Sequence, residues 1–241
     1  MSHILKKLSL TLCTCAVLSG AVMGQSARTT LRIGCTDIYK DQHTLYLRQI
    51  KGKKAEAQEI QLNIHSMNDP LLYKGERKLS FYRTQEEAED TENKAKPCAT
   101  CRLPASGSCF LLLIPSTDKT DKATSDYRIL VIPSSDVAFG SFMLMNYSSH
   151  PLHASIDKTK GKILPGKRKV FHFPRGINNA RTRMFIEPTQ GKFQSIRSSK
   201  WSLAADTREF IVLYNAPQSK GVLFKHIVDK KIEKKALTEN L

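Results

Sequence analysis

Short segments with alternating apolar and polar residues, or with continuous apolar runs, recur between residues 44 and 228. Alternation with a period of two, bounded by Asn, Asp, Gly, Pro and Ser, is typical of β-strands. Many short strands without interleaved helical segments indicate an all-β sandwich or barrel. The pattern predicts strands at Thr44–Ile50, Glu59–Ile64, Lys78–Arg83, Cys109–Ile114, Tyr127–Ile132, Ser141–Asn146, Leu152–Ile156, Lys169–Phe173, Met184–Glu187, Phe193–Ile196, Glu209–Tyr214 and Gly221–Val228.

Helical signals are few. Residues 85–96 contain good helix formers but almost no apolar side chains to pack, so we expect a solvated loop or a frayed helix there. With the cysteine-bearing residues that follow, they form a long polar insertion at 84–108. A second polar loop is expected at 115–125, and the charged tail 230–241 is expected to form a short helix or to stay disordered. No internal repeat is recognisable in the sequence.

The amino terminus has the pattern of an export signal. Lys6 and Lys7 precede an uncharged, mostly apolar run of 16 residues, Leu8–Met23, and small residues follow it. This order is what a signal peptidase recognises, and it predicts cleavage after Gly24 or after Ala27. The run is shorter than the ~20 residues that cross a bilayer comfortably, and no later segment is long and apolar enough to do so. We therefore expect a secreted mature chain, periplasmic or extracellular, without a transmembrane segment; an uncleaved membrane anchor is the alternative.

Removal of the signal peptide at 1–27 leaves four cysteines: Cys35, Cys98, Cys101 and Cys109. An even number of cysteines in an exported protein indicates structural disulfides, and the sequence does not choose among the three possible pairings. Cys98 and Cys101 form a CxxC motif, which suits thiol–disulfide exchange or zinc in other contexts. Prolines flank the pair and leave no room for a helix to start at it. Structural disulfides are the expectation, and thiol–disulfide or metal chemistry at the CxxC is the alternative.

Charge is the unusual part of the composition. The 241 residues include 38 Lys plus Arg against 22 Asp plus Glu, a net charge of +16, whereas 40% hydrophobic and 25% charged residues are typical of a folded globular protein. Residues 28–137 hold 17 basic and 15 acidic residues, and residues 138–241 hold 19 and 7. The change predicts an N-terminal β domain at 28–137 and a basic C-terminal β-sandwich at 138–229. A single larger sandwich is the alternative.

The excess of positive charge is concentrated at 151–201. Such a field attracts polyanions and speeds their association. The expected partner is an anionic envelope polymer, a lipid headgroup or a glycan; export disfavours nucleic acid, although the chemistry allows it. A solvated basic face without a specific partner is the alternative. The candidate anion-binding residues are Lys158, Lys160, Lys162, Lys167, Arg168, Lys169, Arg175, Arg181 and Arg183.

Motifs for catalysis are missing from the sequence. It contains no GxSxG, no HExxH and no Gly-rich phosphate loop. His150, His153 and His172 are more typical of surface and strand-end positions than of a metal site. We therefore expect no catalytic residues, no metal and no cofactor, and interpret the chain as a non-enzymatic binding or structural protein of the cell envelope. No motif indicates an oligomeric state.

One stretch of the second half resembles a known type of module. An apolar strand ends in Asn146, a Ser-rich turn and a second strand follow, and Leu164-Pro165-Gly166 precedes a third. This resembles exported bacterial β-sandwich modules of the form strand, Asn-x-Ser, apolar strand, Leu-x-Pro-Gly, strand. Residues 69–83 and 207–229 are similar to uncharacterised exported proteins of planctomycete and verrucomicrobial type. The resemblance covers about two-thirds of the mature chain and implies an immunoglobulin-like β-sandwich and an exported location, with no assigned catalytic residues.

Overall fold

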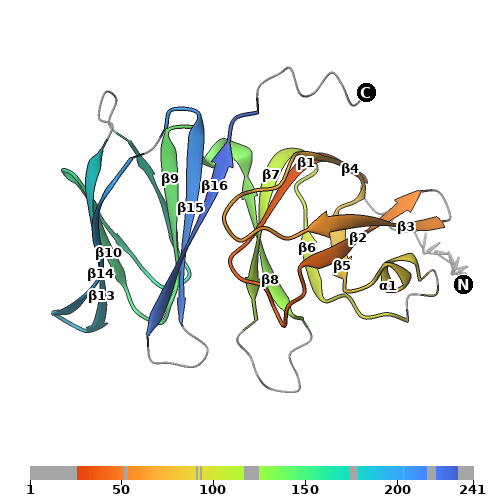
Figure 1. Cartoon of the computed structure of the whole chain (residues 1–241), viewed down its shortest axis with the longest axis horizontal. Helices are drawn as coiled ribbons and strands as arrows, with labels where there is room; N and C mark the ends of the chain where they lie inside the picture. The colour runs from red at the N-terminus through yellow and green to blue at the C-terminus, as the bar shows by residue number, and fades with distance from the viewer. Residues whose placement is uncertain are drawn as a thin grey trace, which may run out of the picture.

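The computed structural model describes residues 26–51, 54–90, 92, 94–116, 125–173, 179–202, 204–215 and 221–232. Strands make up most of this part of the chain, and helix is confined to two short segments among the described residues (Figure 1). The predicted all-β sandwich architecture is confirmed. The apolar run of the expected signal, the cleavage point after Gly24 and tail residues 233–241 lie outside the described residues.

The described strands form four sheets of four strands each. Sheet A has the order β4-β1-β7-β8, and sheet B the order β3-β2-β5-β6. Sheet C has the order β12-β9-β15-β16, and sheet D the order β11-β10-β13-β14. The N-terminal sandwich, sheets A and B, consists of β1 (Ser26–Cys35), β2 (Thr44–Lys51), β3 (Lys54–Gln61), β4 (Leu71–Glu76), β5 (Lys78–Tyr82), β6 (Ala99–Arg102), β7 (Ser106–Pro115) and β8 (Tyr127–Pro133), with the short helix α1 (Gln85–Glu89). The C-terminal sandwich, sheets C and D, consists of β9 (Ser141–Tyr147), β10 (Leu152–Ile156), β11 (Thr159–Ile163), β12 (Arg168–His172), β13 (Ala180–Thr189), β14 (Lys192–Trp201), β15 (Thr207–Asn215) and β16 (Val222–Lys230), and the 3-10 helix η1 (Ser134–Asp136) precedes it.

The sheets are stacked face to face in the order B, A, C, D (Figure 1). One apolar core lies between sheets B and A, and another lies between sheets C and D. A third core, which includes Phe110, Met143 and Phe210, joins sheet A to sheet C. The two sandwiches therefore share a continuous apolar interface, and the long axis of the molecule runs through four layers.

Continuous apolar runs occupy the two inner layers, where both faces of a strand are buried. In β7, Leu111 and Leu113 face the core of the N-terminal sandwich, while Phe110 and Leu112 on the opposite face enter the shared core. β9 and β15 follow the same rule. Strands of the outer sheets B and D bury one face only, and their sequences alternate accordingly.

The two sandwiches have the same topology. Each strand of the first corresponds to the strand eight places later, from β1 with β9 to β8 with β16. The pairing directions match as well, since β1 runs parallel to β7 and β9 runs parallel to β15, while the other pairs are antiparallel. Phe110 of β7 and Phe210 of the corresponding strand β15 touch across the shared core, with ring centroids 4.7 Å apart. The structure thus contains an internal repeat that the sequence does not reveal, because the match is one of topology and burial.

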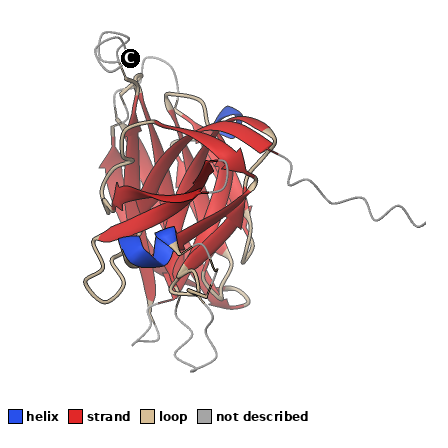
Figure 2. Cartoon of the chain, turned by 90° about the vertical axis from the view of Figure 1, so that its right-hand side faces the viewer, coloured by secondary structure: helices blue, strands red, loops and turns tan. Residues whose placement is uncertain are grey.

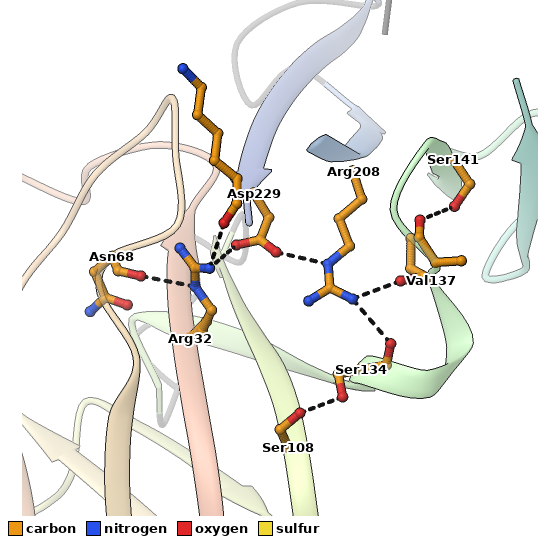
Figure 3. A network of polar contacts seen from close by, with 10 residues as sticks. Arg32, Asn68, Ser108, Ser134, Val137, Ser141, Arg208 and Asp229 are labelled. Atoms are coloured by element: carbon orange, nitrogen blue, oxygen red, sulfur yellow. Dashed lines mark hydrogen bonds and ion pairs between the residues drawn. The ribbon is translucent and has the colours of Figure 1, made fainter. Parts of the chain in front are cut away.

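A buried ion network also joins the two sandwiches (Figure 3). Asp229 of β16 is fully buried and lies 2.7 Å from Arg32 of β1 and 2.7 Å from Arg208 of β15. Arg32 also donates to the carbonyl oxygens of Asn68 and Lys230. The Arg208 guanidinium lies between two phenylalanine rings, 4.3 Å from the centroid of each, and donates to the carbonyl of Val137. These contacts fix how sheet A lies on sheet C.

Several predicted boundaries need correction. The sequence pattern misses β1, β4, β6 and β11. It predicts β3 at 59–64, whereas the structure has this strand at Lys54–Gln61. The 84–108 segment is better integrated than a polar insertion. It forms α1, whose first turn is capped by the Thr84 hydroxyl, and it supplies edge strand β6, while Cys98, Ala99 and Leu103 are buried in the N-terminal core.

Local side-chain and backbone chemistry shapes the turns around Asn146 and Gly166. Asn146 closes an Asx turn, because its side-chain oxygen accepts a hydrogen bond from the Ser148 amide at 3.1 Å. The buried Asn146 amide nitrogen donates to the carbonyls of His150 and Ile163 at 2.8 Å each. Gly166 adopts a positive φ of 73°, which the Pro-Gly turn requires.

Candidate anion-binding face

The outer surface of sheet D carries exposed basic residues on the two strands that flank β10. In β10, β11 and β13, alternate side chains such as Ala154, Ile163 and Met184 fill the core between sheets C and D. The residues between them must therefore point to solvent. Lys160 and Lys162 of β11 and Arg181 and Arg183 of β13 are accordingly exposed. We call this surface the D face; it forms one end of the four-layer stack (Figure 1).

Strand register places these residues in rows across the sheet. One row runs from Lys160 through Ser155 of β10 to Arg183 and on to Ser198 of β14. The next row runs from Lys162 through His153 to Phe185. Arg181 lies opposite Lys200 of β14. The cations therefore form two columns, one on β11 and one on β13, on either side of β10.

A hollow of about 460 Å³ lies between the two columns. We call it the β10 trough. The outward residues of β10, His153 and Ser155, lie between longer side chains from the neighbouring strands. The residues that line it are His153, Ala154, Ser155, Lys160, Gly161, Lys162, Arg183 and Phe185.

Glu187 is the carboxylate nearest one end of the trough. Its Oε2 lies 2.9 Å from Nε2 of His153 and 3.0 Å from Nζ of Lys162, and its Oε1 accepts the Gly191 amide at 3.0 Å. The Gly191 hydrogen bond and then those from His153 and Lys162 lower the pKa of Glu187 to about 2. This carboxylate is therefore ionised at neutral pH and offsets part of the charge at that end of the trough.

The remaining predicted anion-binding residues within the described part of the chain do not line the trough. Lys158 lies in the tight turn between β10 and β11, and Lys167–Lys169 lie at the start of β12 in sheet C. Arg168 is paired with Asp136 at 2.9 Å, and Nζ of Lys169 lies 5.4 Å from the Phe171 ring centroid. Arg175 lies outside the described residues. The single basic cluster of the sequence thus divides between two sheets.

Several residues of the D face are not identifiable from charge alone. His153, Ser155, Phe185 and Glu187 line or close the trough, and Phe193 of β14 is 57% exposed with its ring against His153 at a centroid distance of 5.0 Å. The alternating Arg-Thr-Arg-Met pattern of β13 is a signal that one face of this strand is charged. The sequence does not show which strand lies beside it.

The opposite end of the molecule has a different character. Helix α1 packs on sheet B, and Arg48 of β2 donates to the carbonyls of Glu87 and Ala88 at 2.7 Å each. The first turn of α1 carries Glu86 and Glu87. Figure 2, with helices in blue, looks onto this end. One end layer is thus partly covered by an acidic helix, while the D face is bare and basic.

The four cysteines in the described part of the chain are not paired. Cys35, Cys98, Cys101 and Cys109 are all free thiols, so the expected disulfides need correction. Cys98, one residue before β6, is buried in the N-terminal core, and Cys101 of β6 is partly buried against the same core. Burial raises the pKa of the Cys35, Cys98 and Cys101 thiols to about 12 and that of Cys109 to about 11.

These thiols lack the properties of reactive or metal-binding sites. A reactive cysteine is exposed and has a lowered pKa. Within the described residues, no group of three His, Cys, Asp or Glu side chains is arranged to hold a metal ion. His150, His153 and His172 are therefore not brought together as ligands. No helix in the described part of the chain is long and apolar enough to cross a membrane.

Comparisons with known proteins add little. No protein-family model matches the chain, and no curated protein matches it. One solved structure, of a Bacteroides uniformis protein proposed to act in cell adhesion, aligns with 85% of this chain and 99% of its own length, at 7% identity and a TM-score of 0.21. Similarity at this level carries no argument about the present chain, so the functional assignment rests on the site itself.

Proposed function

We propose that this protein is an exported, non-enzymatic binding protein of the cell envelope that holds anionic polymers on its D face. The observation that carries the proposal is the double column of exposed cations, Lys160 and Lys162 on one side of β10 and Arg181 and Arg183 on the other. Export rests on the amino-terminal pattern of charge, apolar run and small residues.

The physical basis is the arrangement of charge. Like charges brought together on a folded surface repel one another unless a counter-charge is present. When Lys and Arg side chains neutralise the charges of a polyanion, the counterions condensed on that polyanion are released, and their entropy favours binding. Arginines add planar, bidentate recognition of sulfate, phosphate or carboxylate. No observation favours the alternative of thiol chemistry at Cys98 and Cys101, because Cys98 is buried, Cys101 is partly buried, and desolvation raises the pKa of both thiols.

The test is the salt dependence of polyanion binding by the whole mature chain, since the shared core would be exposed in separate halves. We compare wild type with the double variant Arg181→Gln/Arg183→Gln, using heparin as the probe. Loss of two cation contacts should lower the slope of log affinity against log salt by about two and weaken binding on the order of tenfold at moderate salt.

The matched control is Lys74→Gln/Lys78→Gln, which removes the same charge from exposed positions on β4 and β5. This variant should bind heparin as wild type does. Equal losses in both double variants would show that only the net charge matters, and would refute the assignment of the D face. Absence of heparin binding by wild type would refute the proposal as a whole.

A further inference from the structure

The β10 trough has the width of one polymer chain. β11 and β13 flank β10 in sheet D, so the two cation columns are two strand spacings apart, about 9.5 Å. Along each column, successive outward residues are about 6.7 Å apart. The two rows that line the trough, the Lys162 row and the Lys160 row, are one such step apart. Arg181 continues the β13 column beyond the hollow, about 13 Å from the Lys162 row.

The floor of the trough is low because Ser155 is small. Ser155 lies in the row between Lys160 and Arg183, and it is directly opposite both in the strand register. Long cationic side chains on both sides and a short hydroxyl side chain between them leave the hollow of about 460 Å³. An anionic group that reaches this floor can contact cations on both sides at once, whereas a flat anionic surface meets only their tips.

One end of the trough is aromatic. Phe185 lines the hollow in the His153 row, and the exposed Phe193 ring packs edge-on against His153. Exposed aromatic rings beside polar groups are a frequent feature of binding surfaces, because they present a large, rigid apolar area at low entropic cost. A ligand with both ring faces and anionic groups would use this end as well as the cation columns.

The carboxylates near the trough lie at its two ends. Asp157 accepts the Arg181 amide at 2.9 Å, and Glu187 is bonded to His153, Lys162 and the Gly191 amide. Both are already partnered within the sheet, and neither lines the hollow. The middle of the trough, from Lys160 to Arg183, therefore carries uncompensated positive charge.

From this geometry we infer that the β10 trough binds a single linear, sulfated polysaccharide chain that lies along β10, with its anionic groups between the two cation columns and a sugar ring against Phe185 and Phe193. The inference rests on the proposed function and goes further by naming the ligand class and its path. A lipid surface or a nucleic-acid duplex would cover the D face without entering the trough.

The decisive variant is Ser155→Phe, which fills the floor without changing any charge. Phenylalanine is favoured in strands, and this position points to solvent, so the fold should be retained. The matched control is Ser198→Phe, at the same row but on β14, outside the hollow. Circular dichroism and thermal melting confirm that each variant folds.

Binding is measured by calorimetry with three probes: a heparin-derived hexasaccharide, linear polyphosphate, and phosphatidylglycerol vesicles. For the hexasaccharide, Ser155→Phe should lose at least tenfold in affinity, and Ser198→Phe should change it less than twofold. Phe193→Ala should weaken hexasaccharide binding several-fold and leave polyphosphate binding unchanged, because polyphosphate has no ring to stack. Ser155→Phe should leave the affinity for vesicles unchanged.

The failure of this inference is distinguishable from failure of the proposed function. If Arg181→Gln/Arg183→Gln weakens hexasaccharide binding while Ser155→Phe does not, the trough is wrong and the D face remains the anion-binding surface. If vesicles or a DNA duplex bind more tightly than the hexasaccharide, the ligand class is wrong. If Ser155→Phe fails to fold, the test is Phe193→Ala. Weaker binding of the hexasaccharide with unchanged binding of polyphosphate supports the inference, and equal effects on the two probes refute it.

Discussion

Substitution of Asp229 by Asn keeps the shape of the side chain but removes the charge that holds two arginines at the junction of the sandwiches. Asp229 is fully buried, and the side chains of Arg32 and Arg208 are only 14% and 12% exposed. Removing one partner of a buried ion pair leaves the other charges desolvated and uncompensated, which costs about 3–5 kcal/mol. We expect Asp229→Asn to lower the free energy of unfolding by that amount.

The assay is urea denaturation at neutral pH, followed by fluorescence and circular dichroism. Because the two sandwiches share an apolar core, wild type should unfold in one transition, and the variant should have a lower midpoint with a similar slope. For a chain of this size the loss corresponds to a decrease in melting temperature of about 6–20 °C.

The control is Asp37→Asn. Asp37 pairs with Lys225, also between the two sandwiches, but at 3.5 Å and with side chains 46% and 30% exposed. Screened pairs of this kind contribute about 0–1 kcal/mol, so this variant should be nearly as stable as wild type. A loss below about 1 kcal/mol for Asp229→Asn, or equal effects of the two variants, would refute the reasoning that the buried network holds the sandwiches together.

Two further predictions concern titratable groups. The four thiols should react slowly with an alkylating reagent in the native protein near pH 8, and all should react after unfolding. The reason is that a thiol with a pKa of about 12 instead of 9.0 has about a thousandfold less thiolate. Rapid labelling of Cys98 or Cys101 in the native protein would contradict this prediction. The pKa of Glu187 is lowered from 4.5 to about 2, so its ionised form stabilises the fold above about pH 4.5 and this effect is lost as the pH falls toward 2. The melting temperatures of wild type and Glu187→Gln should therefore differ at neutral pH and converge in acid. A difference that does not depend on pH would contradict this role of Glu187.

The sequence predicts most strands because their side chains alternate or form apolar runs. It predicts β10 at Leu152–Ile156, with the bounds the structure shows. It fails at β11, Thr159–Ile163, whose residues are mostly polar or glycine. This strand is specified by its pairing with β10 and by the buried Ile163, which are tertiary effects. The same holds for β6, which is set by pairing with β5.

Continuous apolar runs in the sequence indicate which strands belong to the inner layers. The continuous apolar runs of β7, β9 and β15 differ from the alternating outer strands because both of their faces are buried. A strand buried on both faces needs a sheet on each side, so these runs predict inner layers. The internal repeat was not visible, since corresponding strands share burial and pairing but few identities.

The candidate site was predictable in its charge and not in its geometry. The sequence contains Lys160, Lys162, Arg181 and Arg183 in one basic region, and the strand register brings these four residues to the same face of sheet D. Arg168 belongs to the same run of sequence, yet sheet C places it beside Asp136. Ser155 is important for the trough because its side chain is small. Only the strand register shows that it lies between two cations.

Lysine footprinting of the wild-type chain locates the surface that heparin covers. The protein is acetylated with a water-soluble reagent, with and without saturating heparin, and each lysine is quantified by peptide mass spectrometry. We expect strong protection of Lys160, Lys162 and Lys200 on the D face and unchanged labelling of Lys74 and Lys78 on the N-terminal sandwich. Protection of Lys74 and Lys78 equal to that of the D face, or no protection of Lys160 and Lys162, would contradict the proposal that the D face is the binding surface.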